Sequence, residues 1–424
     1  MASGGTFLGE MKVRTTIRAD RLIDGAGAVM ENATLVIEDE RVLGCFTGDA
    51  PPASEGQPTT ELAFPGCSVL PGLIDTHVHL NLPGDGLSLE DAVREDDGVL
   101  VAISMANAAR ALRAGITTVR DVGGARNTVF NVRRALSLGY GDGPRVLACG
   151  QPITITGGHT WYFGGEADGE EGVRLKVRAM AKAGSDFTKV MATGGGTLNT
   201  MSWLPSYGLR ELTALADESH RLGRRITAHC LCAQAIEWVV QAGFDQIEHG
   251  GFLVSADGRQ EFDPRAAARI AKAGIPVTST LAVGGYMLKE YRARQARGRL
   301  SATDQRVLDR WLRMFDDNLS QFRKMREAGV TWVAGTDAGW RFTVIEGLPM
   351  ELELMREGGC AAMEAIVAGT GLAAKAIGID DKVGTLAPGK LADVLVVGGN
   401  PLVDLGHLAD IRMVLQAGRV RMPR

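Results

Sequence analysis

Short apolar segments alternate with longer helix-like segments through most of the chain, and this alternation constrains the fold more than any other feature. Ala-Gly pairs stand directly before a predicted strand at residues 114–115, 183–184, 242–243, 273–274 and 328–329. Glycine is the residue expected just past the end of a helix. A strand that follows at once indicates repeated strand–helix units and a parallel sheet.

The alternation predicts an α/β fold with one strand in each repeated unit. The predicted strands are residues 69–79, 117–122, 145–149, 187–192, 225–230, 246–249, 276–281 and 332–337. Predicted helices include residues 99–113, 170–183, 209–222, 233–242, 348–357 and 363–377. Eight parallel strands with intervening helices are the composition of a (β/α)8 TIM-like barrel.

Both ends of the chain have a different character. Short strand and turn patterns run from residue 12 to residue 68, and strand patterns return near the C-terminus. We expect the two ends to form one small β-sandwich domain, with the barrel inserted between its halves. The predicted limits are 1–68 and 385–424 for the small domain and 69–384 for the barrel.

Composition excludes several classes of protein. The net charge of −4 gives no broad basic surface, so nucleic acid is not an expected partner. Neither a long apolar span nor an N-terminal signal is present, so we expect no membrane association and a cytoplasmic location. The six scattered cysteines, mostly in apolar surroundings, are expected to be reduced.

Chemically active side chains gather at the predicted strand ends. His77 and His79 stand two residues apart and therefore share one face of a strand. His229, His249 and Asp337 end three later strands. Several imidazoles and a carboxylate suit zinc or a similar divalent ion. The alternative for His77 and His79 is that they are two polar residues that a half-buried strand directs toward solvent.

Lys189 lies on the fourth predicted strand, among these candidate ligands. Burial lowers the pKa of a lysine, and a neutral amine can react with carbon dioxide to give an anionic carbamate. Such a group could bridge two metal ions. The alternative is a lysine that pairs with an acid or extends to the rim of the barrel.

The motifs together resemble the amidohydrolase superfamily along nearly the whole chain. Residues 71–79 are similar to its PG-(hydrophobic)2-D-x-H-x-H signature, and residues 189–195, 228–229, 247–250 and 335–339 resemble further family motifs. The lysine motif resembles the binuclear, carboxylated-lysine branch that includes Xaa-Pro dipeptidases and ochratoxin-hydrolysing amidohydrolases.

The resemblance implies a ligand set and a cofactor. Two divalent ions, expected to be Zn2+, would be held by six residues: His77, His79, Lys189 as its carbamate, His229, His249 and Asp337. Asp337 would also take a proton from the attacking water and pass it to the leaving nitrogen. The implied reaction is hydrolysis of an amide bond that releases a C-terminal amino acid from dipeptides or N-acyl amino acids, aromatic ones such as ochratoxin A included.

Other residues are candidates for substrate binding. His159, in a Gly-rich loop, could stabilise the oxyanion. Arg341 could clamp a substrate carboxylate, and Tyr207 follows the lysine strand. Each has the alternative of a surface or packing residue. The side chains proposed for an apolar pocket wall are Trp161, Met201, Trp203 and Leu204.

Three other functions compete with amide hydrolysis of this kind. A cyclic-amide hydrolase or deaminase of the imidazolonepropionase type shares the superfamily, but mononuclear deaminases generally lack a bridging lysine. A barrel without catalysis would have no need of a complete ligand set, and nucleic-acid binding has no basic patch. The family resemblance also implies a small-molecule substrate and a homo-oligomer.

Overall fold

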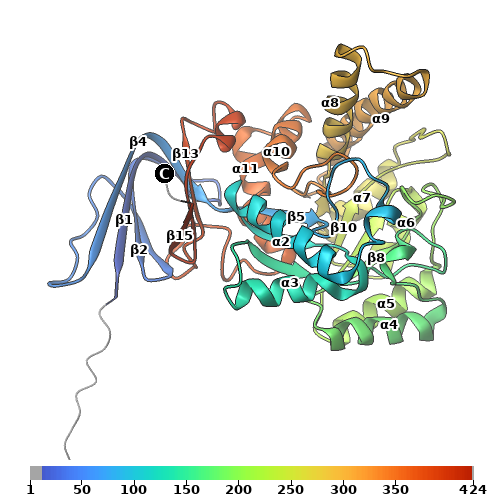
Figure 1. Cartoon of the computed structure of the whole chain (residues 1–424), viewed down its shortest axis with the longest axis horizontal. Helices are drawn as coiled ribbons and strands as arrows, with labels where there is room; N and C mark the ends of the chain where they lie inside the picture. The colour runs from blue at the N-terminus through green and yellow to red at the C-terminus, as the bar shows by residue number, and fades with distance from the viewer. Residues whose placement is uncertain (1–11, 423–424) are drawn as a thin grey trace, which may run out of the picture.

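Eight parallel strands in two sheets form the centre of the larger part of the molecule. The computed structural model describes residues 12–422 (Figure 1). One sheet has the order β5 (Leu73–Val78), β6 (Ile116–Asp121), β7 (Arg145–Ala148). The other consists of β8 (Thr188–Met191), β9 (Ile226–Cys230), β10 (Gln246–His249), β11 (Val277–Thr278) and β12 (Trp332–Val333), hydrogen-bonded in that order.

These strands confirm the predicted parallel α/β arrangement. Each of the eight lies within or overlaps a predicted strand. Isolated parallel bridges link the two sheets at both edges, one between Ile153 and Val190 and the other between Val78 and Ala338. The carboxyl ends of the strands are therefore held close together, which is what positions the site.

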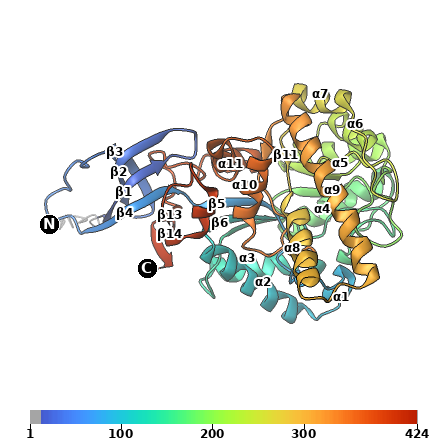
Figure 2. The ribbon, with the colours of Figure 1, turned by 90° about the horizontal axis from the view of Figure 1, so that it is seen from above.

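Helices connect the strands and cover their outer side (Figures 1 and 2). They are α1 (Leu89–Ala92), α2 (Asp97–Arg113), η1 (Ala125–Asn127), α3 (Thr128–Ser137), η2 (Trp161–Phe163), α4 (Gly169–Ala183), α5 (Leu209–Arg221), α6 (Ala233–Gln241), α7 (Pro264–Ala273), α8 (Ala282–Ala296), α9 (Ala302–Glu327), α10 (Leu348–Glu357), α11 (Ala362–Ala368), α12 (Gly371–Ile377) and η3 (Leu405–Ala409). The single helix predicted over 363–377 is two helices, because Thr370 adopts non-helical angles of φ −138° and ψ −100°.

The helix pair α8–α9 is an addition between β11 and β12 that the strand–helix pattern does not anticipate. Ser301 and Asp304 form a capping box at the start of α9, which is 26 residues long. Gly284 on α8 allows close packing, because a Cβ there would lie 2.6 Å from the ring of Phe315 on α9. Figures 1 and 2 show the pair at the edge of the strand region.

Strands from both chain ends form one sheet of seven. Its order is β15 (Arg419–Met422), β14 (Ile411–Gln416), β13 (Val394–Gly398), β4 (Thr59–Pro71), β1 (Arg14–Ile23), β2 (Val29–Glu38) and β3 (Arg41–Thr47). These are the strands of the predicted small β-sandwich domain, and hydrogen bonds join all seven. The long strand β4 pairs with β1 on one side and β13 on the other, so the hydrogen bonds run through one continuous sheet. Residues 1–11 and 423–424 of the predicted small domain lie outside the described residues.

The sheet of seven has its own apolar core, separate from the core around the parallel strands. Ile17, Leu35, Val69 and Val394 are among its buried members. Cys45, Cys149, Cys230, Cys232 and Cys360 are free cysteines. Among the described residues, no helix has the length and apolarity needed to cross a membrane.

Candidate active site

A cavity of about 540 Å³ opens at the carboxyl ends of the parallel strands. This volume is within the range of about 300–1,000 Å³ that is typical of small-molecule sites. Five of the seven histidines in the chain line it. The sequence predicts polar side chains at these strand ends, and the structure brings them into one cavity.

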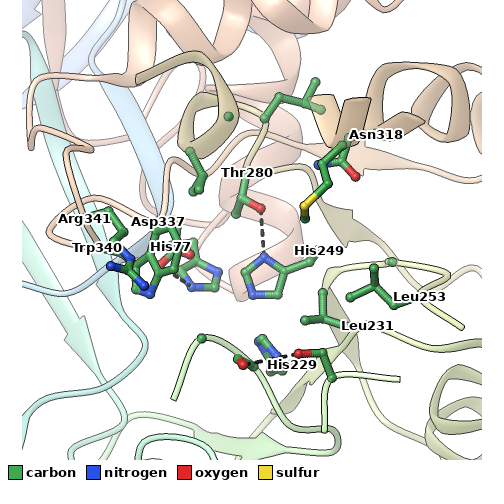
Figure 3. Close-up of a pocket in the computed structure, with 18 of the residues that line it drawn as sticks. His77, His229, Leu231, His249, Leu253, Thr280, Asn318, Asp337, Trp340 and Arg341 are labelled. Atoms are coloured by element: carbon green, nitrogen blue, oxygen red, sulfur yellow. Dashed lines mark hydrogen bonds and ion pairs between the residues drawn. The ribbon is translucent and has the colours of Figure 1, made fainter. Parts of the chain in front are cut away.

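The five imidazoles form a continuous row across the cavity floor. The ring centroids of His79 and His77 are 5.5 Å apart, and those of His77 and His249 are 4.9 Å apart. His249 is 4.6 Å from His229, which is 4.7 Å from His159. Four strands or strand-following loops, far apart in the sequence, contribute these rings, and Figure 3 labels His77, His229 and His249.

Asp337 completes a three-residue group at one end of the row. Its Oδ1 lies 3.4 Å from Nε2 of His77 and 3.2 Å from Nε2 of His79. Their possible ligand atoms lie within 4.8 Å of one another, so the group could hold a metal ion. Burial would raise the pKa of Asp337, but His77 and His79 outweigh it and hold that pKa well below its usual value.

Hydrogen bonds on the far side of the first two rings determine which nitrogen faces the cavity. Nδ1 of His77 is 2.8 Å from Oε2 of Glu248, and Nδ1 of His79 is 2.8 Å from the carbonyl oxygen of Gly123. A carboxylate and a carbonyl only accept, so each Nδ1 carries the proton and each Nε2 is free to bind an ion.

His229 and His249 have the same kind of support. Nε2 of His229 donates to the carbonyl oxygen of Gly194 at 3.1 Å, and Nδ1 of His249 is 2.8 Å from Oγ1 of Thr280. Burial lowers the pKa of both imidazoles well below the ordinary value. Neutral, oriented imidazoles are the form that binds a divalent ion, so this donor set fits one.

Left-handed backbone conformations aim several of these side chains. His249 has φ 68°, Thr280 φ 51° and Asp337 φ 57°. Such angles are uncommon for residues other than glycine and are concentrated at functional sites. Glu248 and His249 are adjacent and would point to opposite faces of a regular strand. Glu248 contacts His77 from the strand, and the positive φ of His249 lets the next residue reach the row of imidazoles as well.

Lys189 is buried and lines the same cavity. It lies two residues before Met191, which is opposite His229 in the pairing of β8 with β9. The Cα of Lys189 is therefore opposite Thr227, two residues before His229. Burial lowers the pKa of Lys189, although Glu248 opposes the shift.

Glu248 and Arg120 form a buried ionic network that sequence reasoning missed in part. Arg120 is the residue before the last one of β6, and it donates to Oε1 of Glu248 at 2.5 Å and to the carbonyl oxygen of Thr76 at 2.7 Å. Oγ1 of Thr227 also donates to Oε1 of Glu248. The other oxygen of Glu248 is left for His77. A charged residue on a short apolar strand, directly before His249, was the available signal.

Two buried aspartates hold the backbone around the ligands. Asp75 accepts from the amides of His77 and Thr336, both at 3.1 Å. Asp121 accepts from the amide of Leu80 at 2.8 Å. Burial raises the pKa of each carboxyl group to about 6.

His159 lies at the other end of the row, with its ring held from behind. Its Nδ1 is 2.8 Å from Oγ1 of Thr197, a hydroxyl group that can donate to Nδ1 and that accepts from the amide of Thr160. Gly195 leaves room for the ring, because a Cβ there would lie 2.4 Å from Nε2. Burial lowers the pKa of His159 to about 3, so the ring is neutral.

The remaining predicted substrate residues lie in different places. Arg341 lines the cavity and stacks on the ring of Trp340, 5.2 Å from its centroid. Tyr207 does not line the cavity; its ring is buried, and its hydroxyl donates to the carbonyl oxygen of Ala167 at 2.8 Å.

The predicted apolar wall is also placed elsewhere. Trp161, Met201, Trp203 and Leu204 do not line the cavity. Three of them, Trp161, Met201 and Leu204, are exposed because their loops direct them to solvent. Helices α8 and α9 provide that wall instead.

The fold and this cavity together define an α/β enzyme whose site lies at the carboxyl ends of its parallel strands. The chain belongs to the amidohydrolase family, whose sequence pattern matches residues 68–423. This confirms the resemblance found in the motifs, and it identifies the protein as a hydrolase.

Individual relatives agree with that membership. The chain is 27% identical to an ochratoxinase of Aspergillus niger over 436 residues, which cover 93% of this chain and 83% of the relative. It is similar to a crystal structure of a Xaa-Pro dipeptidase with bound methionine in the active site, with a TM-score of 0.81, 26% identity, and coverage of 96% and 99% of the two chains. An imidazolonepropionase of Mesorhizobium japonicum is 23% identical over 91% of each chain.

Proposed function

We propose that this protein is a binuclear metal-dependent amidohydrolase that releases a C-terminal amino acid from N-acyl amino acids or dipeptides. One observation carries the proposal: His77, His79, His229, His249, Lys189 and Asp337 all line one cavity. The ochratoxinase and Xaa-Pro dipeptidase relatives support this choice of reaction, and aromatic substrates such as ochratoxin A belong to the proposed class.

The proposed ligands divide into two groups around Lys189. His77, His79 and Asp337 would hold one ion, and His229 and His249 the other. The neutral amine of Lys189 would attack carbon dioxide, lose a proton and become a carbamate, which would be an anionic ligand for the ions. Two divalent ions, zinc in this proposal, would supply an acidified water and a polarised substrate carbonyl.

The chain's own residues perform the remaining steps. Asp337 accepts a proton from the attacking water and delivers it to the amide nitrogen, which leaves poorly unless it is protonated. His159 donates a hydrogen bond to the carbonyl oxygen as negative charge develops there. Arg341, which forms no ion pair with a described residue, binds the carboxylate of the leaving amino acid.

The alternative is a cyclic-amide hydrolase or deaminase of the imidazolonepropionase type, which the relative from Mesorhizobium japonicum suggests. Lys189 in the cavity favours the binuclear enzyme. Metal analysis and a hydrolysis screen distinguish the two. We expect about two ions per chain and release of an amino acid from N-acyl amino acids. One ion per chain, with turnover of cyclic amides alone, would support the alternative.

We infer three further properties of the protein. The two parallel sheets close into a (β/α)8 barrel over residues 69–384, which the two edge bridges support. Residues 1–68 and 385–424 together form the small β domain, as their shared sheet suggests. The protein is a homo-oligomer, to be tested by light scattering in solution.

A further inference from the structure

The cavity extends in two directions from the row of histidines. Figure 3 shows Arg341 and Trp340 at one side, next to Asp337 and His77. Leu231 and Leu253 lie at the opposite side, with His249 between the two ends. A substrate whose scissile bond lies at the histidines therefore places one part at each end.

The cavity has an apolar wall made largely by the added helix pair, and this wall reaches Trp340, next to Arg341. Side chains of α8 and α9 that face the cavity include Val283, Met287, Tyr291, Val307, Trp311 and Met314. The loop after β10 holds this wall in place, because Gln260 donates to Asn318 of α9 at 2.6 Å. Trp311 also contacts Trp340, with the two ring centroids 6.2 Å apart.

The cavity contains very little negative charge. Asp337 is the only carboxylate among the described residues that line it, and it is a proposed metal ligand. Glu248 lies behind His77 and is paired with Arg120. The cationic side chains that line the cavity are Arg310 and Arg341, while Lys189 is the proposed carbamate.

This distribution of charge bears on the amino end of a substrate. A dipeptide carries an ammonium group on the carbon next to the scissile carbonyl, whereas an N-acyl amino acid with a simple acyl group does not. An ammonium group without a carboxylate partner loses its hydration in such a cavity and gains no ion pair. Bound divalent ions would repel it further.

We propose that the preferred substrates are N-acyl amino acids with a bulky, apolar, uncharged acyl group, and that dipeptides with a free amino group are poor substrates. The inference rests on the proposed amidohydrolase function and narrows its substrate class. The acyl group occupies the wall of α8 and α9, and the carboxylate of the leaving amino acid lies toward Arg341.

Two compounds of nearly the same shape test the proposal. N-(3-phenylpropanoyl)-L-phenylalanine and L-phenylalanyl-L-phenylalanine differ only by the amino group. We expect the metal-loaded full-length enzyme to hydrolyse the first with a kcat/KM at least about tenfold higher, which corresponds to about 1.4 kcal/mol. Equal values, or a preference for the dipeptide, would overturn the inference and leave the proposed function standing. Hydrolysis of neither compound would overturn both.

The ratio of the two kcat/KM values, measured at several pH values, tests whether the charge of the amino group causes the preference for the N-acyl compound. The α-amino group titrates near pH 8 (about 7.7–8.0 in model peptides), so the amino group of the dipeptide is mostly uncharged at pH 9. We expect the ratio of the two kcat/KM values to fall between pH 7 and pH 9. A constant ratio would show that the amino group is excluded by shape and would contradict the electrostatic argument.

A matched pair of variants provides an independent measurement. Leu231 lies next to the row of histidines on the apolar side (Figure 3). Leu231→Asp introduces a carboxylate there, and Leu231→Asn introduces a side chain of the same size without charge. We expect the ratio of kcat/KM for the N-acyl compound to kcat/KM for the dipeptide to be several-fold lower in the aspartate variant than in the asparagine variant. Equal ratios in the two variants would count against the proposal.

Discussion

Oε2 of Glu248 lies 2.8 Å from Nδ1 of His77, while its other oxygen accepts from Arg120 and Thr227. Both oxygens of this buried carboxylate are therefore occupied, and the His77 ring is held with Nε2 toward the cavity. A carboxylate that orients an imidazole ligand raises the basicity of the ring and fixes its tautomer. Glu248 is in this sense a positioning residue for the proposed metal site.

Replacement of Glu248 by glutamine is expected to weaken metal binding. The amide keeps the shape of the side chain but removes the charge that holds the Nδ1 proton of His77. We expect the metal affinity to fall about 10- to 100-fold, measured by competition with a chelator. Glu218→Gln is the control, because Glu218 is also a buried carboxylate paired with arginines but lies outside the cavity. A loss of affinity that is equal in both variants would contradict the role of Glu248.

Asp337→Asn tests the proposed proton transfer. Asparagine fills the same space but cannot take a proton from water. We expect kcat to fall by about 10²- to 10⁴-fold with a retained fold, since general acid–base catalysis contributes that much. Circular dichroism and metal content should accompany the kinetics. A variant that retains two ions and wild-type turnover would rule out the assigned role.

The location of the strands and of most cavity residues can be predicted from sequence because the signals are local. A short apolar run after Ala-Gly marks each strand, and the carboxyl ends of parallel strands meet at one edge. His229 and Asp337 are both at such ends and both line the cavity. The direction of the Tyr207 side chain, in contrast, depends on packing, and its ring lies in the core.

Other features depended on contacts that a pattern does not contain. Glu248 reaches His77 across 171 residues of sequence, and the left-handed conformation of His249 has no sequence signal. The continuity of the terminal sheet depends on β4, which pairs with strands from both ends of the chain. The role of α8 and α9 in the cavity likewise appears only in three dimensions.

Thr197 is expected to control the hydrogen bonding of His159. Its Oγ1 accepts from the amide of Thr160 and lies 2.8 Å from Nδ1 of His159. Thr197→Val removes this contact but keeps the shape, so the ring loses its fixed orientation. We expect kcat to fall about tenfold and KM to stay nearly unchanged. A tenfold fall corresponds to slightly more than about 1 kcal/mol, which is the contribution of one hydrogen bond.

Thr197→Ser supplies the control for this variant, because serine retains the hydroxyl group. We expect it to recover most of the lost kcat. If serine and valine were equally impaired, the methyl group of Thr197 would matter rather than its hydroxyl, and the positioning role would be refuted.

Glu351 on α10 gives a prediction about stability and pH. Its buried carboxyl group accepts from the amide of Leu281 at 3.1 Å, and it also interacts with Ser279 and the amide of Ala282. Burial raises its pKa from 4.5 to about 7. Between these two values the folded state binds a proton that the unfolded state has lost, so this group's contribution to stability falls as pH rises. The contribution is complete below about pH 4.5 and is lost as pH passes through 7.

Glu351→Gln removes that contribution while it keeps the size and one acceptor oxygen of the side chain. Urea unfolding of the wild type and the variant at several pH values from 5 to 8 isolates the contribution of Glu351 to the free energy of unfolding. All other titrating groups are common to the two proteins. We expect wild-type stability, relative to the variant, to decrease by up to about 3 kcal/mol over this range. A difference that stays constant with pH would mean that Glu351 is ionised throughout, and that its hydrogen bonds compensate fully for its burial.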